Sequence, residues 1–174
     1  MRCRQPHGFV LIELVTTLIL IGVIGAFAGL FLYNGINGYL ASKRNSESAL
    51  KVQVALDRIS AELRNIKATP KPIFGTKAIT YQNEIAPLNQ NRILQIEDGP
   101  QGPGIYLTVG GGAKNLLLDS VNVAQSDITC VATKNLDNEN NNNEISAIRV
   151  TFQLIEMGTP FKAEIYPRAL ITYP

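Results

Sequence analysis

The chain has 174 residues, of which 45% are hydrophobic, and its formal net charge is +2. This length favours one globular domain with an attached segment, and the small charge gives no general attraction to nucleic acid or to acidic partners. Arg2 and Arg4 account for the whole excess, since without them 16 − 2 = 14 basic residues face 14 acidic ones.

Histidine and cysteine are scarce. His7 is the one histidine, and Cys3 and Cys130 are the two cysteines. A chain that began at Phe9 would contain no histidine and a single cysteine. Such a chain could not use Ser-His-Asp catalysis, a histidine zinc site or an intramolecular disulfide.

The first predicted element is a membrane-spanning helix. Residues 14–33, LVTTLILIGVIGAFAGLFLY, are 20 residues without a charge. As a helix they would extend about 30 Å, the thickness of the hydrocarbon core of a bilayer. Gly25 and Gly29 form a small-xxx-small pair that allows close helix approach, although they could equally only loosen the segment. Glu13 directly precedes this stretch, and a carboxylate inside a membrane costs roughly a few kcal/mol.

Two interpretations of this segment need no special family. A secretory signal peptide would have residues 1–7 as its basic region, and Ala26-Phe27-Ala28 resembles its cleavage site. Glu13 argues against it, because the apolar region of a signal peptide should be uncharged. A plain membrane anchor would place Glu13 near the helix end, where its carboxylate could reach the lipid headgroups.

The third interpretation rests on a resemblance. The stretch GFVLIELVTTLILIGVIG resembles the N-terminus of type IV prepilins and type II secretion pseudopilins. The resemblance implies that residues 1–8 are a leader, that a prepilin peptidase cleaves between Gly8 and Phe9, and that Phe9 is then N-methylated. It also implies that Glu13 is the family's assembly glutamate. Many major pilins have a proline where this chain has Leu30, so the resemblance leaves the helix geometry at that point open.

Glu13 could serve as the counter-charge of a buried N-terminal amine. After cleavage Phe9 would carry a positively charged amine, and a charge buried in a fiber core needs a counter-charge. The family's assembly scheme pairs the glutamate with the amine of a neighbouring subunit. Contact between Glu13 and its own N-terminus is sterically possible as well, so both pairings remain open.

The helix is predicted to continue through residues 40–68. Two prolines, Pro70 and Pro72, end it, so we expect one helix from Phe9 to Ala68, about 90 Å long. Its second half should pack on a sheet, since a coiled coil would need a longer repeat. Apolar residues form a one-sided stripe at 4-3-4-3 spacing: Val52, Leu56, Ile59, Leu63 and Ile66. The opposite face is predicted to carry Lys51, Asp57, Arg58, Glu62 and Arg64.

Residues 73–174 are predicted to form strands. The glycine-rich GGGAK indicates a hairpin turn. Pro167 lies in the register of the last strand, which is therefore predicted to be an edge strand or to be interrupted there. One long N-terminal helix packed on an antiparallel β-sheet makes the fold class α+β and pilin-like. The expected strands are 78–82, 93–97, 104–109, 115–121, 127–133, 147–156 and 161–173.

Candidate sites in this part are weak. The tract Asn135–Glu144 offers side-chain oxygens at alternate positions, which makes calcium binding conceivable, but it lacks the EF-hand glycine and is more typical of a solvated loop. No other metal site and no cofactor is predicted. Cys130 is expected to be a buried structural thiol, with a redox or partner-linked role as the alternative. Four tyrosines could form a contact surface or half-buried strand positions: Tyr81, Tyr106, Tyr166 and Tyr173.

No catalytic residues are predicted, and the chain is not expected to be an enzyme. Glu139 and Glu144 have no neighbour that would tune their pKa values. GGGAK lacks the spacing and the Ser/Thr of a phosphate-binding loop. Lysines and arginines are scattered rather than clustered, so no nucleic-acid partner is expected.

Together these observations predict a minor pilin or minor pseudopilin. Residues 1–8 would be the leader, 9–39 the transmembrane and assembly helix, 40–68 its amphipathic continuation and 73–174 the β-rich domain. The chain would cross the bacterial inner membrane once, with its C-terminal domain in the periplasm, and would then enter a pilus or pseudopilus fiber. Its partners would be prepilin peptidase, other subunits and inner-membrane lipid.

The orientation and the minor role have modest support. Arg2 and Arg4 on the leader side fit the positive-inside rule, and Lys43 and Arg44 on the far side weaken it. The missing proline at Leu30 and the absence of a cysteine pair in the globular part favour a minor subunit. The alternatives are a membrane-anchored periplasmic binding or adhesive domain, and a DNA-uptake pseudopilin with a basic tip surface.

Overall fold

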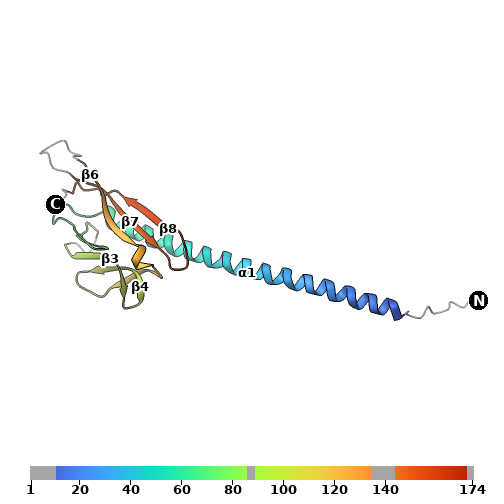
Figure 1. Ribbon diagram of the computed structural model, residues 1–174. Coiled ribbons are helices and arrows are strands. Elements are labelled where there is room, and N and C mark those ends of the chain that lie inside the picture. The colour runs from blue at the N-terminus through green and yellow to red at the C-terminus, as the bar shows by residue number, and fades with distance from the viewer. Residues whose placement is uncertain (1–10, 86–88, 135–143, 172–174) are drawn as a thin grey trace, which may run out of the picture. The chain divides into compact units, whose positions relative to one another are not determined.

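The computed structural model describes residues 11–85, 89–134 and 144–171 (Figure 1). The chain divides into two compact units, one ending at Ala49 and the other beginning at Leu50. The first unit contains the N-terminal part of helix α1 (Leu11–Arg64). The second contains the end of α1 and eight described strands, which confirms the α+β class.

In the first unit the described residues form helix alone. From Leu11 to Ala49 every side chain is exposed except the half-buried Ser48. A window of mean hydropathy 2.4, with none of its residues buried, makes α1 long and apolar enough to cross a membrane. The predicted start of the helix at Phe9 lies outside the described residues.

Helix α1 ends at Arg64, four positions before the predicted Ala68. The side-chain amide of Asn65 donates to the carbonyl of Ala61 at 2.7 Å, and Ile66 already forms a bridge with Asn83. The backbone N–H of Lys67 donates to the carbonyl of Gln82 at 2.8 Å. Pairing with the sheet, rather than the prolines, therefore ends the helix.

The first sheet has five antiparallel strands in sequence order. Strand β2 has the predicted bounds, whereas the three residues of β1 are too short to show alternation and were not predicted. The expected hairpin turn joins β4 to β5, and Gly110 and Gly111 adopt φ values of 61° and 73°, which favour glycine. The strands are β1 Ile73–Gly75, β2 Ala78–Gln82, β3 Asn91–Gly99, β4 Gly102–Val109 and β5 Asn115–Asp119.

The second sheet has three antiparallel strands, β6 (Asp127–Lys134), β7 (Glu144–Gln153) and β8 (Pro160–Ile165), in that order. The antiparallel strands that were expected beside the helix are therefore divided between two sheets. After β5 the chain forms the 3₁₀ helix η1 (Val123–Gln125), and β6 pairs with β7 rather than with β5. Strand β8 is an edge strand that ends two residues before Pro167, as predicted.

The core of the second unit lies between α1 and the sheets. Val52, Ile59, Leu63 and Ile66 are buried and Leu56 is half-buried, which confirms the apolar stripe. The placement of Glu62 on the opposite face is wrong, because its side chain is fully buried. Position 62 lies three residues after Ile59 and seven after Ala55, both of which are buried, so helical geometry places it on the core face.

Candidate functional site

Glu13 lies in the first turn of the described part of α1 and is exposed. The hydroxyl of Thr16 donates to the carbonyls of Ile12 and Glu13, both at 3.0 Å, and the hydroxyl of Thr17 donates to that of Leu14 at 2.9 Å. These hydroxyls are satisfied within the helix, so the surface around Glu13 behaves as apolar. Gly8 and Phe9, the predicted cleavage and methylation residues, lie outside the described residues.

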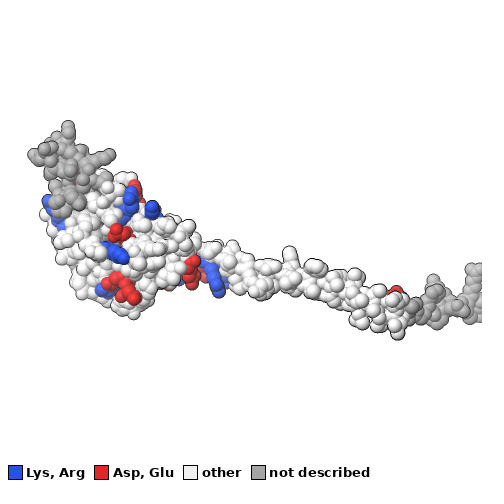
Figure 2. Space-filling model, in the orientation of Figure 1, with Lys and Arg blue, Asp and Glu red and all other residues white. Residues whose placement is uncertain are grey.

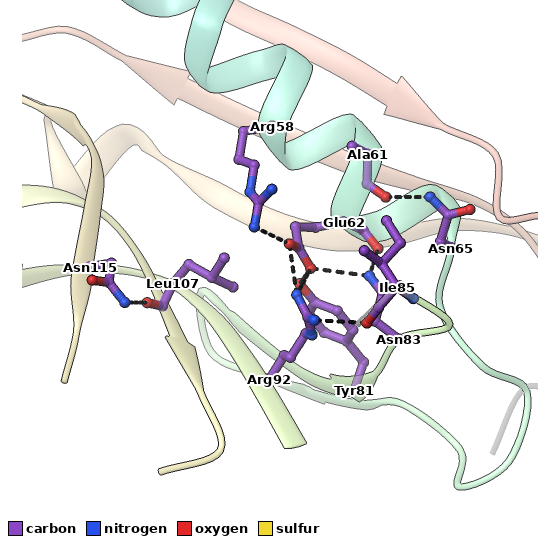
Figure 3. A network of polar contacts seen from close by, with 10 residues as sticks. All are labelled: Arg58, Ala61, Glu62, Asn65, Tyr81, Asn83, Ile85, Arg92, Leu107 and Asn115. Atoms are coloured by element: carbon purple, nitrogen blue, oxygen red, sulfur yellow. Dashed lines mark hydrogen bonds and ion pairs between the residues drawn. The ribbon is translucent and has the colours of Figure 1, made fainter. Parts of the chain in front are cut away.

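A second carboxylate, Glu62, lies at the centre of a buried polar cluster (Figure 3). Both of its oxygens accept from Arg92 Nη1 at 2.8 Å, and Oε1 also accepts from Arg58 Nη2 at 2.8 Å. Its Oε2 accepts from the Tyr81 hydroxyl at 3.2 Å and from the Asn83 amide at 3.1 Å. Two arginines and two neutral donors thus surround one carboxylate.

Secondary structure positions each member of the Glu62 cluster. Arg58 lies one helical turn before Glu62, at the i, i+4 spacing that lets the two side chains meet. Tyr81 on β2 and Arg92 on β3 are directly opposite in the antiparallel register, so their side chains share the face toward α1. Asn83 follows β2 and donates to the backbone carbonyl of Glu62 at 2.8 Å. The cluster therefore fastens the last turns of α1 to strands β2 and β3.

The same cluster orders the chain after β2. The Asn83 side-chain oxygen accepts from the backbone N–H of Ile85 at 2.8 Å, and Arg92 Nη2 donates to the Ile85 carbonyl at 3.0 Å. The pKa of Tyr81 is raised well above its usual 10.0, first by burial and then by the negative charge of Glu62. Tyr81 therefore stays protonated and donates, which suits a structural lock rather than acid–base chemistry.

Sequence reasoning missed this cluster, although two signals were present. Glu62 is in phase with the apolar stripe of α1. Arg92 alternates with Leu94 and Ile96 along β3, and all three are buried. A charged residue in phase with core residues on two separate elements indicates a buried ion pair.

The other residues predicted as candidate sites do not come together in one place. Tyr81 and Tyr106 are buried and Tyr166 is exposed, so these three do not form one contact surface, and Tyr173 lies outside the described residues. Cys130 is half-buried on β6.

Most of the tract predicted as a possible calcium site lies outside the described residues. Residues 135–143 lie outside the described residues, and Glu144 is buried on β7. The part of the chain that the structure describes holds no group of three or more His, Cys, Asp or Glu side chains placed to bind a metal. On the face drawn in Figure 2, acidic and basic side chains of the globular unit are intermixed.

Comparisons with protein families, with curated proteins and with solved structures gave no match. The class of this protein is therefore described from its own fold and its own polar cluster. It is an α+β domain whose helix is fastened to the sheet by a buried ion cluster. The same helix contains an uncovered apolar segment that could cross a membrane.

Proposed function

We propose that the chain is a minor pilin or pseudopilin. It would be made as a prepilin in the bacterial inner membrane, with its C-terminal domain in the periplasm. Prepilin peptidase would cleave between Gly8 and Phe9, and the subunit would assemble through α1 into a type IV pilus or a type II secretion pseudopilus. The observation that carries this proposal is the joint placement of Gly8, Phe9 and Glu13 directly before residues 14–33, which carry no charge.

The uncovered helix supports this proposal. Between Leu11 and Leu40 every side chain is exposed and most are apolar, and an exposed apolar surface of this length requires lipid or other apolar helices around it. A bilayer would supply that environment before assembly. A bundle of α1 helices would supply it afterwards.

The carboxylate of Glu13 would have a different free energy in the bilayer and in a fiber. Alone in a bilayer, its carboxylate is costly or must reach the headgroups. In a fiber it would pair with the amine of Phe9 on a neighbouring subunit. The carboxylate would thus favour entry into the fiber and would set the register of the incoming subunit.

The Glu62 cluster supports a subunit role in a second way. A fiber held together by helices must transmit force from each helix to its globular domain. A carboxylate that joins α1 to β3 through Arg92 and to β2 through Tyr81 is a stiff connection at that point. This argument would hold for any domain anchored by α1, so the motif at Gly8 remains the decisive observation.

The mature N-terminus tests the proposal. The full chain is produced in cells with and without prepilin peptidase, and the purified protein is sequenced by mass spectrometry. We expect N-methyl-Phe9 with the peptidase and Met1 without it. A start at Met1 in both samples would identify a plain membrane anchor, and a start at Gly29 would identify a secreted domain; either result would reject the proposal.

A further inference from the structure

Two basic residues on α1, Lys43 and Arg44, are not explained by the proposed function. They are the first charged residues after Glu13. The positive-inside rule places most lysines and arginines near the cytoplasmic end of a membrane helix, and in the proposed orientation this basic pair lies at the other end. Cations in that position therefore need a reason of their own.

The spacing of the charges along α1 matches the thickness of a whole bilayer. Residues 14–42 separate Glu13 from Lys43, carry no charge, and are helical and exposed throughout. As a helix they extend about 44 Å. A bilayer with its headgroup regions is about 40–45 Å thick. When Glu13 lies among the headgroups of one leaflet, Lys43 and Arg44 therefore lie at the headgroups of the other.

Two tyrosines lie near the same end of this uncharged segment. Tyr33 and Tyr39 are 66% and 68% exposed. Tyrosine is enriched where a membrane meets water, because its ring is apolar and its hydroxyl is polar. Tyr39 lies one helical turn before Lys43, so these two side chains share a face of α1. Helical side chains also lean toward the N-terminus, which directs Lys43 and Arg44 back toward the bilayer.

The positive charges of the basic pair are largely uncompensated. Among the residues that the structure describes, Arg44 is exposed and has no ion-pair partner. Lys43 Nζ lies 3.9 Å from Glu47 Oε1, and the two side chains are 58% and 63% exposed. Glu47 is one turn farther from the uncharged segment, so both cations are closer to the lipid than this carboxylate is. A negatively charged membrane surface would therefore meet positive charge first.

We propose that Lys43 and Arg44 bind the phosphates of anionic phospholipids in the periplasmic leaflet of the inner membrane. In such a lipid no ammonium group of the headgroup compensates the phosphate charge, so the lipid complements an unpaired cation. Arginine can hold a phosphate through two parallel N–H···O bonds, and lysine adds a point charge. These contacts would fix the depth of α1 in the bilayer.

This inference rests on the proposed function, because it requires α1 to cross the membrane in the proposed orientation. It adds the chemical class of the lipid and the residues that hold it. It requires neither cleavage at Phe9 nor entry into a fiber, so an experiment on the membrane-bound chain can test it separately.

Fluorescence quenching by brominated lipids tests the contact. The chain contains no tryptophan, so Tyr39→Trp gives the full chain a single fluorophore one turn from Lys43. The protein is reconstituted into bilayers of phosphatidylcholine and phosphatidylglycerol in which one lipid or the other is brominated. We expect the anionic lipid to bind beside the fluorophore about fivefold more strongly than the neutral lipid. Equal quenching by the two lipids, or none by either, would overturn the proposal.

Charge variants in the Tyr39→Trp chain make the test specific. Lys43→Gln combined with Arg44→Gln should abolish the lipid preference. Glu47→Gln removes the nearby negative charge and should increase the preference. The control, Lys71→Gln combined with Lys162→Gln, removes the same total charge from exposed positions of the second unit and should leave the preference unchanged. A preference that survives loss of the basic pair, or that falls equally in the control, would overturn the proposal.

The lipid contact and the pilin proposal fail separately. If prepilin peptidase cleaves the chain before Phe9 and the chain shows no lipid preference, the lipid contact is rejected and the pilin proposal stands. If the chain shows the preference and is not cleaved, the pilin proposal is rejected and the lipid contact stands. High salt should weaken the preference in either case, because exposed charges are screened; a preference independent of salt would reject the role of the two cations.

Discussion

Glu13 and Glu62 are carboxylates on the same helix, and their surroundings are opposite. Glu13 is exposed in the first unit, and no described residue hydrogen-bonds to its carboxylate. Glu62 is fully buried in the second unit and accepts from four side chains. The comparison shows how one chain can hold a charge whose partner is inside the fold and another whose partner would come from outside.

The energetic consequence differs accordingly. A buried charge contributes little net stability when fully paired, but removing its partner leaves an uncompensated charge that is costly. An exposed charge with no partner contributes almost nothing to folding. Glu62 should therefore matter for the stability of the fold, and Glu13 for assembly.

The largest expected effect is at Glu62. Glu62→Ala leaves Arg92 buried without its carboxylate and should lower the free energy of unfolding by about 3–5 kcal/mol. Chemical denaturation of the full chain in detergent measures it. The control is Glu47→Ala on the same helix, because the Glu47–Lys43 pair is exposed at 3.9 Å and its loss should cost at most about 0.5 kcal/mol. Equal losses in the two variants would show that the cluster is not a lock.

Tyr81 should give a smaller effect. Tyr81→Phe removes one donor to Glu62 and should cost about 1 kcal/mol at neutral pH. The raised pKa of Tyr81 also predicts a pH dependence: its stabilisation is complete below pH 10.0, the ordinary value, and falls as the pH rises above it. Denaturation at increasing pH checks this, because the loss should be shallower in Tyr81→Phe. Tyr166→Phe is the control, since Tyr166 is exposed, and a matching change there would refute the assignment.

A feature of the fold could be predicted from the sequence where it depends on neighbouring residues, and not where it depends on residues far apart in the chain. Helix α1, the bounds of β2 and the edge character of β8 follow from local patterns of apolar residues and proline. The division into two sheets depends on pairings between distant strands, such as Cys130 with Ile148, which no local pattern specifies.

The two carboxylates illustrate the same limit. Glu13 is predicted as an assembly residue because its spacing from Gly8 and Phe9 resembles that of a known family motif. Glu62 was misplaced because its charge was given more weight than its phase, although position 62 lies on the core face of the helix. Its partner Arg92 is 30 residues away on β3, so only the folded chain brings the two together.

Removal of an exposed ion pair should change the free energy of unfolding still less. The Arg149 guanidinium on β7 holds the pKa of the Glu164 carboxyl on β8 below its usual 4.5, and both side chains are exposed. A carboxylate with a lowered pKa contributes its stabilisation above the unfolded value and loses it as the pH falls through the folded value. Arg149→Ala should return the pKa of Glu164 toward 4.5 in an NMR titration. The pKa of Glu97, which Lys114 lowers, should not move in that variant.

The smallest change in the free energy of unfolding is expected at Glu13. Glu13→Ala removes a carboxylate with no described partner, so denaturation of the full chain in detergent should be unchanged. Cleavage at Phe9 should also persist, because the proposed cleavage site lies before Glu13. Incorporation into fibers should be lost, since the amine of a neighbouring subunit would have no counter-charge. Quantitation of the variant in sheared fibers against the membrane fraction measures this.

The double comparison with Glu62→Ala makes the Glu13 result specific. A subunit that is unstable and one that cannot assemble both disappear from fibers, but only the unstable one loses its free energy of unfolding. Glu13→Gln keeps the shape and removes the charge, so it should fail to assemble as Glu13→Ala does. Normal incorporation of either Glu13 variant would reject the pairing of Glu13 with Phe9. Of the two glutamates compared here, only Glu62 would then have a structural role.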